Sequence, residues 1–315
     1  MKKNNINYFK KNYLNFLNCK INYKVKKIRC EICGSSKSHK IIDYISWGAK
    51  RYGYMPIVSC DICGFVFQNF RFSKRFYESF YSKYYREKIF KNLSPSKNFL
   101  SDQKERGLKL FKFLKKENYI KKKGKMLDVG CSAGLFLKPF LNQGWECFGN
   151  DPDKNYIEYG IKKYNLPIKF EQAENMSLKK KSLDLIIIMG SLEHCFNPNI
   201  VMKKCSQAAK VGGLLVLEAR GNPQSKSKNY FNHNHHRYFS ENSQELMMIK
   251  HGFIPLLTTS YPITGPTRKG GIYTIGIKKN KKINLKKIIN SGKKESLGTV
   301  IYKYKYFDKI YKDNS

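Results

Sequence analysis

The fold is decided at residues 125–136, which read KMLDVGCSAGLF. A short apolar strand ends there in an acid and a glycine turn, and a helix begins immediately afterwards. Glycines let a backbone pass close to a ligand, and the start of a helix offers free N–H groups. The spacing Gly130-x-x-x-Gly134 is not the G-x-G-x-x-G pattern of dinucleotide sites, and Asp128 would repel a pyrophosphate. The stretch therefore favours a cationic ligand.

A second acid follows in residues 147–152, which read CFGNDP and predict another short strand. An open α/β sheet places at this point the carboxylate that binds a ribose diol, about twenty residues after the glycine turn. A cationic ligand that carries an adenosyl ribose is S-adenosylmethionine. Asp128 and Asp151 together therefore predict a site for this cofactor.

At this point the chain resembles the class I S-adenosylmethionine-dependent methyltransferases, and further motifs follow in that family's order. FEQAE at 170–174 stands where the family contacts adenine. SLDLIIIMGSLEH at 182–194 is similar to its fourth-strand motif, and VGGLLVLE at 211–218 is similar to its turn into strand five. The resemblance implies an α/β fold with a Rossmann-like sheet of seven strands, and methyltransferase activity.

The resemblance also implies roles for individual residues. Asp128 would support the amino acid moiety of the cofactor, directly or through water, and Asp151 would bind both ribose hydroxyls. Gln172 departs from the acid that the family more often carries beside adenine. Cys131 either belongs to the close-approach turn or only packs. The implied cofactor-binding set is Asp128, Gly130, Cys131, Gly134, Asp151, Pro152, Gln172, Ala173, Met189 and Glu193.

Apolar periodicity around these motifs predicts an alternating α/β chain. The expected helices lie at 105–119, 135–143, 153–164, 199–210 and 242–251. The expected strands lie at 125–130, 146–151, 168–170, 183–189 and 214–219, followed by an antiparallel pair at 254–261 and 271–277.

Two matching C-x-x-C-G turns precede this region, CEICG at 30–34 and CDICG at 60–64. Two such turns supply four thiolates, which predict a closed and therefore structural zinc site; the alternative is four reduced cysteines without metal. Short strands at 40–44 and 55–59 predict a zinc-ribbon-like hairpin between the turns. Zinc ribbons also bind nucleic acid, so this module does not identify the substrate. The predicted ligands are Cys30, Cys33, Cys60 and Cys63.

The expected organisation is a polar leader that is frayed or forms one weak helix, a zinc-ribbon-like module, an aromatic and charged bridge, the methyltransferase domain and a Lys- and Tyr-rich tail. The bridge aromatics either stack on a sugar or base or pack against the next domain. A cysteine module followed by such a bridge is similar to bacterial methyltransferases of surface-glycan and deoxysugar pathways. The five segments are 1–28, 29–70, 71–104, 105–278 and 279–315.

Residues 232–240 read NHNHHRYFS and hold three of the six histidines. The sugar C-methyltransferases have a similar segment, with a Glu where this chain has Asn234. The resemblance gives His233 or His235 the role of general base. A metal site and a polar substrate loop, with Ser240 capping the next helix, are the alternatives. His194 is a further catalytic candidate, although the Glu193-His194 pair more commonly closes the cofactor pocket in this family.

The net charge of +38 has two interpretations. It attracts RNA, an anionic membrane leaflet or a phosphate-bearing substrate, or it reflects codon bias, since lysines are scattered through every segment. No apolar run approaches the ~18–20 residues of a membrane span, and the first residues lack an apolar signal region, so we expect a cytoplasmic protein.

These observations predict methyl transfer to an oxygen or carbon of a sugar, nucleotide-linked or part of a surface-glycan precursor. The expected cofactors are S-adenosylmethionine and a structural Zn²⁺, and the expected partner is an anionic small-molecule or glycan acceptor. Methylation of RNA is the alternative function. A second alternative is a degenerate methyltransferase fold that acts as a binding module.

Overall fold

The computed structural model describes residues 5–48, 51–220, 230–260, 263, 271–280 and 283–312. The chain divides into two compact units, and each is assembled from separated stretches of sequence. The first unit comprises Met1–Ile89, Gly221–Leu246 and Asn284–Ser315, and the second comprises Phe90–Arg220 and Met247–Ile283. The cysteine turns and the histidine segment, defined here as residues 230–240, therefore belong to the same unit.

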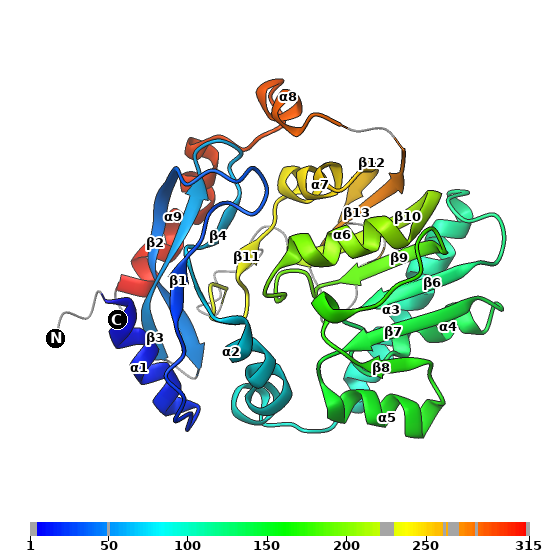
Figure 1. Ribbon diagram of the computed structural model, residues 1–315, viewed down its shortest axis with the longest axis horizontal. Coiled ribbons are helices and arrows are strands. Elements are labelled where there is room, and N and C mark those ends of the chain that lie inside the picture. The colour runs from blue at the N-terminus through cyan, green and yellow to red at the C-terminus, as the bar shows by residue number, and fades with distance from the viewer. Residues whose placement is uncertain are drawn as a thin grey trace. The chain divides into compact units, whose positions relative to one another are not determined.

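The second unit is built on a seven-stranded sheet with the order β12-β13-β10-β9-β6-β7-β8 (Figure 1). Neighbouring strands from β10 to β8 run parallel, whereas β13 runs antiparallel to both β10 and β12. The expected Rossmann-like sheet of seven strands is confirmed. Its strands are β6 (Lys125–Val129), β7 (Glu146–Asp151), β8 (Ile168–Phe170), β9 (Leu183–Met189), β10 (Ala209–Arg220), β12 (Phe253–Thr259) and β13 (Gly271–Lys278).

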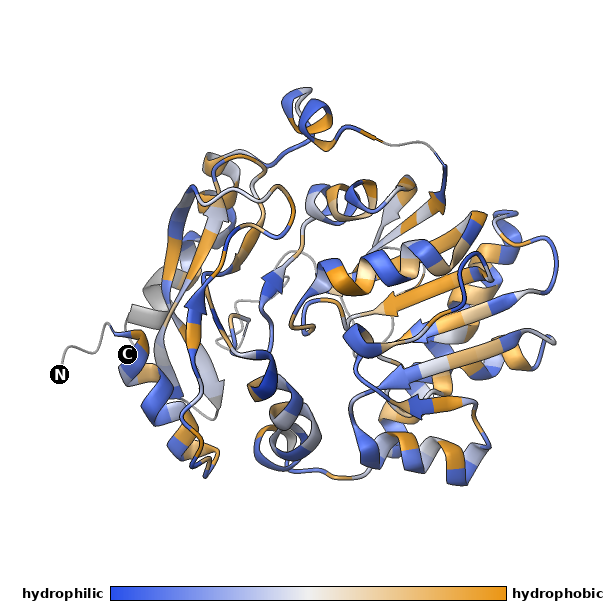
Figure 2. Ribbon diagram, in the orientation of Figure 1, coloured by the Kyte–Doolittle hydropathy of each residue, from blue (hydrophilic) through white to orange (hydrophobic). Residues whose placement is uncertain are grey.

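Strand order reverses beside β6, because β7 and β8 lie on one side of it and β9 lies on the other. Open α/β sheets bind their ligands at such a point, at the carboxyl ends of the strands. The predicted strand 254–261 corresponds to β12, and Tyr261 lies outside the described residues. Strand β9 is almost wholly hydrophobic (Figure 2), as expected for a strand that is covered on both faces.

The helices of this unit follow the predicted alternation, with two differences. Helix α3 begins well before the predicted start at 105, because Ser96 caps it by accepting a hydrogen bond from the Phe99 N–H at 3.2 Å. The predicted helix 135–143 is a 3₁₀ turn, η2, followed by the short helix α4, since Pro139 has no N–H to continue one uninterrupted helix. The elements are α3 (Lys97–Lys116), η2 (Leu135–Leu137), α4 (Lys138–Leu141), α5 (Lys154–Tyr164), the 3₁₀ turn η3 (Ala173–Asn175) and α6 (Pro198–Ala208).

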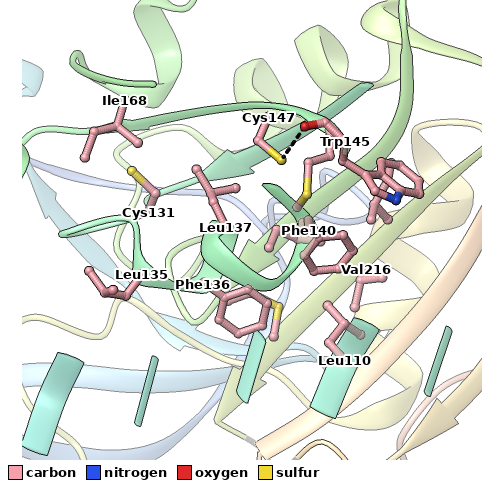
Figure 3. Packing of buried hydrophobic residues seen from close by; sticks show 14 of the residues in the cluster. Leu110, Cys131, Leu135, Phe136, Leu137, Phe140, Trp145, Cys147, Ile168 and Val216 are labelled. Atoms are coloured by element: carbon pink, nitrogen blue, oxygen red, sulfur yellow. Dashed lines mark hydrogen bonds between the residues drawn. The ribbon is translucent and has the colours of Figure 1, made fainter. Parts of the chain in front are cut away.

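A buried apolar cluster attaches α3, η2 and α4 to the sheet (Figure 3). Phe136 and Phe140 lie at its centre with Leu110 of α3 and Val216 of β10. Burial of each such side chain stabilises the fold by about 1.5–3 kcal/mol. The close approach of α3 requires Gly107, because a Cβ there would lie 2.4 Å from the Phe136 carbonyl oxygen. The cluster therefore holds the segment that follows the glycine turn.

The first unit contains a four-stranded sheet in the order β11-β4-β3-β2 and a separate antiparallel pair, β1 with β5. The predicted hairpin strands at 40–44 and 55–59 lie inside longer strands, β2 and β3, which are antiparallel. Strand β11 lies in the histidine segment. The strands are β1 (Val25–Lys27), β2 (Ser38–Gly48), β3 (Arg51–Cys60), β4 (Val66–Gln68), β5 (Phe70–Phe72) and β11 (Arg237–Tyr238).

Helices from three parts of the chain complete this unit. The expected polar leader contains α1 (Ile6–Phe16), which Asn5 caps. The expected bridge contributes α2 (Lys74–Ser79) and the π-helical turn η1 (Phe80–Phe90), and Phe76 and Phe80 are fully buried, as in the packing interpretation of the bridge aromatics.

The Lys- and Tyr-rich residues 279–315 contain α8 (Leu285–Asn290) and α9 (Leu297–Lys312). Val300, Tyr304 and Phe307 of α9 are buried, and the last two rings contact Tyr230 and Phe231. These three positions lie one helical turn apart, so the segment carries one apolar face. Through the part of the chain that the structure describes, no helix combines the length and apolarity needed to cross a bilayer.

Helix α7 (Glu241–Lys250) follows the histidine segment. Its first turn is capped as predicted, because Ser240 Oγ accepts a hydrogen bond from the Ser243 N–H at 3.2 Å.

Candidate cofactor site and metal centre

The turn after β6 lies at the carboxyl edge of the second unit's sheet. Gly130 has φ +76°, and a Cβ there would lie 2.4 Å from the Ser191 side chain, so only glycine fits. The N–H groups of Gly130 and Cys131 donate to the Asn150 carbonyl at 2.9 and 3.0 Å. Gly134, also at φ +76°, precedes the η2 turn. The backbone is thereby held open for a ligand at the point where the strand order reverses.

Asp128 lies in β6, two residues before Gly130, and is buried with 2% of its surface exposed. Its Oδ1 has no hydrogen-bond partner among the described residues. Burial and then the charge of Asp151 raise the pKa of Asp128 to about 8, although Arg106 acts in the opposite direction. A buried carboxyl group with an unsatisfied oxygen fits a cationic ligand group, since a cation offsets both its desolvation and its repulsion by Asp151.

Asp151 ends β7 beside the same loop and is only half-buried. Its Oδ2 accepts the Ser132 N–H at 2.8 Å and its Oδ1 accepts the Asp153 N–H at 2.9 Å. The two N–H groups orient this carboxylate, and each carboxylate oxygen can accept more than one hydrogen bond, as a ribose diol requires. The chemistry of Asp128 and Asp151 thus fits the amino group and the ribose of S-adenosylmethionine, as the sequence predicts.

Cys131 is 1% exposed, and its thiol packs close to Gly149. Burial, followed by the charges of Asp128 and Asp151, raises the pKa of this thiol well above its usual range. These surroundings favour the packing interpretation over a chemical role.

The other predicted cofactor residues lie at the same sheet edge. Met189 ends β9 with 8% of its surface exposed, and Glu193 lies in the turn after it with 1% exposed. Pro152 directly follows β7 and is half-buried. Ala173 begins η3, and Gln172 directly precedes it without making a side-chain capping hydrogen bond. The assignment of these residues to the cofactor stays a prediction.

The four predicted cysteines converge in the first unit. All four sulfur atoms lie within 4.8 Å of one another. The Cys30 and Cys63 sulfurs are 3.6 Å apart, and those of Cys33 and Cys60 are 3.4 Å apart. Tetrahedral zinc with Zn–S bonds of about 2.3 Å spaces its sulfurs by about 3.8 Å. The cluster therefore fits a tetrahedral ion whose four positions are all filled by protein.

His233 lies in the interior of the first unit and is 1% exposed. Rings of α1 and α2 surround it, the nearest being Tyr13 at 4.2 Å between centroids, with Phe76 at 5.9 Å. Neither ring nitrogen has a hydrogen-bond partner among the described residues. Burial, followed by the charge of Arg71, lowers the pKa of His233 to about 3. Such an enclosed imidazole is a poor general base, because a methyl-acceptor substrate cannot reach it and because it binds a proton weakly.

His235 has a different environment, set by Asn232. Asn232 Oδ1 accepts the backbone N–H groups of Asn234 and His235 at 3.0 and 3.2 Å, which orients the amide. The Asn232 amide nitrogen therefore faces His235 Nδ1, 2.8 Å away, and donates to it. The neutral ring then carries its proton on Nε2. In this form His235 offers a hydrogen-bond donor, and acts as a base only after a change of tautomer.

Sequence reasoning missed two sets of buried polar residues. Arg106 of α3 forms an ion pair with Glu218 of β10, with 2.7 Å between Nη2 and Oε2, and both side chains are almost fully buried. Gln68 and Arg237 bind backbone and acidic groups around the histidine segment. Gln68 follows the apolar residues 65–67, which is a local signal of burial, whereas Arg106 and Arg237 lie among polar residues that give no such signal.

Residues 127–217 match the family model for a methyltransferase domain. This stretch has the family signature of a methyltransferase domain. It contains Asp128, the glycine turn, Asp151 and the whole of β9.

The chain is similar to ubiquinone biosynthesis O-methyltransferases over a stretch of about the same length. The protein of Pelagibacter ubique (strain HTCC1062) is 33% identical over 97 residues, which is 30% of this chain and 40% of that protein. The one from Nitrobacter winogradskyi is 29% identical over 97 residues, covering 29% of this chain and 37% of that protein. The chain therefore spans about two fifths of the length of these relatives.

Among solved structures, the chain resembles a possible histamine N-methyltransferase from Thermotoga maritima, at 19% identity and a TM-score of 0.45, covering 58% of this chain and 93% of that one. It also resembles the 1,6-didemethyltoxoflavin-N1-methyltransferase of Burkholderia thailandensis, at 12% identity and a TM-score of 0.45, covering 58% and 82%.

Proposed function

We propose that this protein is an S-adenosylmethionine-dependent methyltransferase whose acceptor is a small molecule, an oxygen or carbon of a sugar that is nucleotide-linked or part of a surface-glycan precursor. The observation that carries the proposal is the pair of acids beside the Gly130 turn. Asp128 has a buried, unsatisfied oxygen, and Asp151 is oriented by two backbone N–H groups. A methyltransferase-family segment with both features supports binding of a cationic adenosyl ligand.

When bound, S-adenosylmethionine supplies an electrophilic methyl group on a sulfonium ion. Asp128 would hold the amino group of the ligand, and the ligand's charge would keep this acid ionised at neutral pH. Asp151 would accept hydrogen bonds from the ribose hydroxyls. Gly130 and Gly134 leave the backbone free of side chains where the ligand passes. The binding of several separate groups fixes the orientation of the methyl group, from which most of the rate enhancement would come.

The acceptor proposal rests on two similarities. The relatives named above are O-methyltransferases, which supports oxygen as the attacking atom. The four-cysteine module and the histidine segment are similar to those of sugar methyltransferases, which supports a sugar. We propose that His235 orients an acceptor oxygen through Nε2–H, and that His194 is the other candidate for proton transfer. A base would add about 10²–10⁴-fold to the rate.

Replacing Asp151 with alanine is expected to weaken binding of S-adenosylhomocysteine by about 1–3 kcal/mol, because hydrogen bonds to the ribose hydroxyls are lost. Isothermal titration calorimetry measures this change. Glu146→Ala is the matched control, since Glu146 begins the strand that Asp151 ends and forms only an exposed ion pair with Lys125. Equal affinity for S-adenosylhomocysteine in the two variants would show that Asp151 does not bind the cofactor.

A methyl-labelling assay tests the acceptor. Purified protein and labelled S-adenosylmethionine are incubated in parallel with nucleotide sugars, glycan extracts and total cellular RNA. The expected label appears in the sugar fractions. Label that is stable in RNA at high salt would replace the sugar proposal with RNA methylation. Retained binding of S-adenosylhomocysteine with no transfer to any fraction would contradict a sugar acceptor.

A further inference from the structure

The histidine segment is bound into the same sheet as the cysteine turns. Strand β11, at its end, pairs antiparallel with β4, which begins two residues after the second C-x-x-C-G turn. At its start the backbone bonds to β2, because the Ser46 N–H donates to the Phe231 carbonyl at 2.8 Å and the His233 N–H donates to the Ser46 carbonyl at 3.0 Å. The segment is therefore an additional part of the metal module, not a loop that leaves it.

Gln68, the last residue of β4, fixes the middle of the segment. Its side chain is fully buried, and its Nε2 donates to the carbonyl oxygens of Asn232 at 2.8 Å and His235 at 2.7 Å. Its backbone N–H donates to the His236 carbonyl at 2.9 Å. One residue thus holds three carbonyl groups of the segment. Its placement also depends on the turn at Cys60–Gly64, which leads directly into β4.

Arg237 joins the segment to the other cysteine turn. Its Nε and Nη2 donate to the two carboxylate oxygens of Glu31, each at 2.6 Å. Glu31 stands between Cys30 and Cys33, and Arg71 approaches the same carboxylate at 3.4 Å. The Arg237 side chain is fully buried, so its charge depends on Glu31 for compensation. A bidentate pair of this kind also fixes the orientation of the guanidinium relative to the carboxylate, since each of the two N–H groups must donate to its own oxygen.

We propose that Glu31, Gln68 and Arg237 are positioning residues through which the four-cysteine site fixes the histidine segment for the acceptor, so that metal occupancy controls acceptor chemistry and not cofactor binding. The assignment of the segment to the acceptor rests on the proposed function. The coupling itself rests on the contacts above. Without the ion the four sulfurs take up protons and no longer hold the two turns together, so Glu31 and β4 would move with the turns.

Hydrogen–deuterium exchange on the full-length protein tests the coupling without an acceptor. Glu31→Gln is expected to speed exchange of the amides in residues 231–238 by about tenfold or more, because the buried Arg237 loses its counter-charge and local opening becomes easier. Asp61→Asn is the matched control. Asp61 occupies the same place in the second C-x-x-C-G turn, but it is exposed. The same charge is removed, yet exchange in the segment should stay at the wild-type rate.

Two further measurements separate positioning from general damage. Zinc content and affinity for S-adenosylhomocysteine should equal the wild-type values in Glu31→Gln, while turnover in the labelling assay falls at unchanged cofactor affinity. If Glu31→Gln loses metal, the test uses Arg237→Lys instead, since that variant keeps the charge, loses the bidentate geometry and leaves both cysteine turns unchanged in sequence. Removing the metal with a chelator should speed exchange in 231–238 while peptides from 125–137 stay protected.

Wild-type exchange rates in residues 231–238 of both Glu31→Gln and Arg237→Lys would overturn the inference. So would a metal-free protein whose histidine segment remains protected. The proposed function fails on a different result, the absence of S-adenosylhomocysteine binding by the wild-type protein. The two ideas can therefore be rejected separately.

Discussion

Asp128→Asn is expected to stabilise the free protein at and above neutral pH and to abolish detectable binding of S-adenosylhomocysteine. Asp128 is 2% exposed, and burial together with the charge of Asp151 raises its pKa to about 8. In the unfolded chain an Asp ionises near its ordinary pKa of about 3.9. At neutral pH Asp128 is therefore ionised in the unfolded chain, whereas the folded protein must either keep this carboxyl group protonated or bury its negative charge.

The sign of the pH dependence follows from proton linkage. A folded-state pKa above the unfolded value makes this site's contribution to stability fall as pH rises from about 4 to about 8, by about 1.4 kcal/mol per pH unit. Asparagine removes that dependence. Thermal melts at several pH values should show the difference in Tm between variant and wild type growing up to about pH 8 and then levelling off.

Asp184→Asn is the control for this experiment. Burial of Asp184 opposes its ionisation, but the Lys125 N–H and the Lys210 ammonium together lower its pKa. Replacing it should leave stability unchanged or reduce it at neutral pH, the opposite sign to Asp128→Asn. An Asp128→Asn protein that melts like the wild type at every pH, or that still binds S-adenosylhomocysteine at wild-type affinity, would contradict the assignment of this acid to the ligand's cation.

Zinc removal is expected to unfold the first unit while the second keeps its fold. Structural zinc in small modules contributes about 10–16 kcal/mol at neutral pH, which matches or exceeds the total stability of a typical domain, about 5–15 kcal/mol. We expect the purified protein to contain one zinc ion per chain. Cys33→Ser should contain none and should lose protection of β2, β3 and the histidine segment in hydrogen exchange.

Cys19→Ser provides a matched control, because Cys19 is a buried cysteine of the same unit that is not part of the four-sulfur cluster. It should keep the metal and most of the stability. Binding of S-adenosylhomocysteine should survive in both variants, since Asp128 and Asp151 belong to the other unit. Purified protein without zinc, or a Cys33→Ser variant with normal protection, would show that the cysteines are structural thiols only.

Most of the methyltransferase domain could be predicted from the sequence, because its signals are local. The short, almost wholly apolar run Leu183–Met189 favours a strand that is covered on both faces, and Gly130 marks a turn where a Cβ would collide. The two acids stand at the ends of their own strands. The two cysteine turns are equally local, since each carries its ligand spacing within five residues.

The limits of prediction lay where distant segments meet. The α9 residues were expected to be a tail, because the many lysines and tyrosines obscure the apolar periodicity of this segment. Its apolar face is recognised only from the contacts of Tyr304 and Phe307 with Tyr230 and Phe231. The start of α3 was missed because Ser96 gives a capping signal no stronger than that of other serines nearby.

The sequence by itself determined the methyltransferase fold and the clustering of the four cysteines, and it predicted the two cofactor acids, since periodicity and motif spacing act over a few residues. Only the tertiary structure distinguished His233 from His235, which the sequence presents as equivalent. Rings of α1 and α2 enclose one of them, and the Asn232 amide orients the other. Only the tertiary structure paired Arg237 with Glu31, 206 positions apart, because a buried charge selects its partner by position in space and leaves no periodic trace in the sequence.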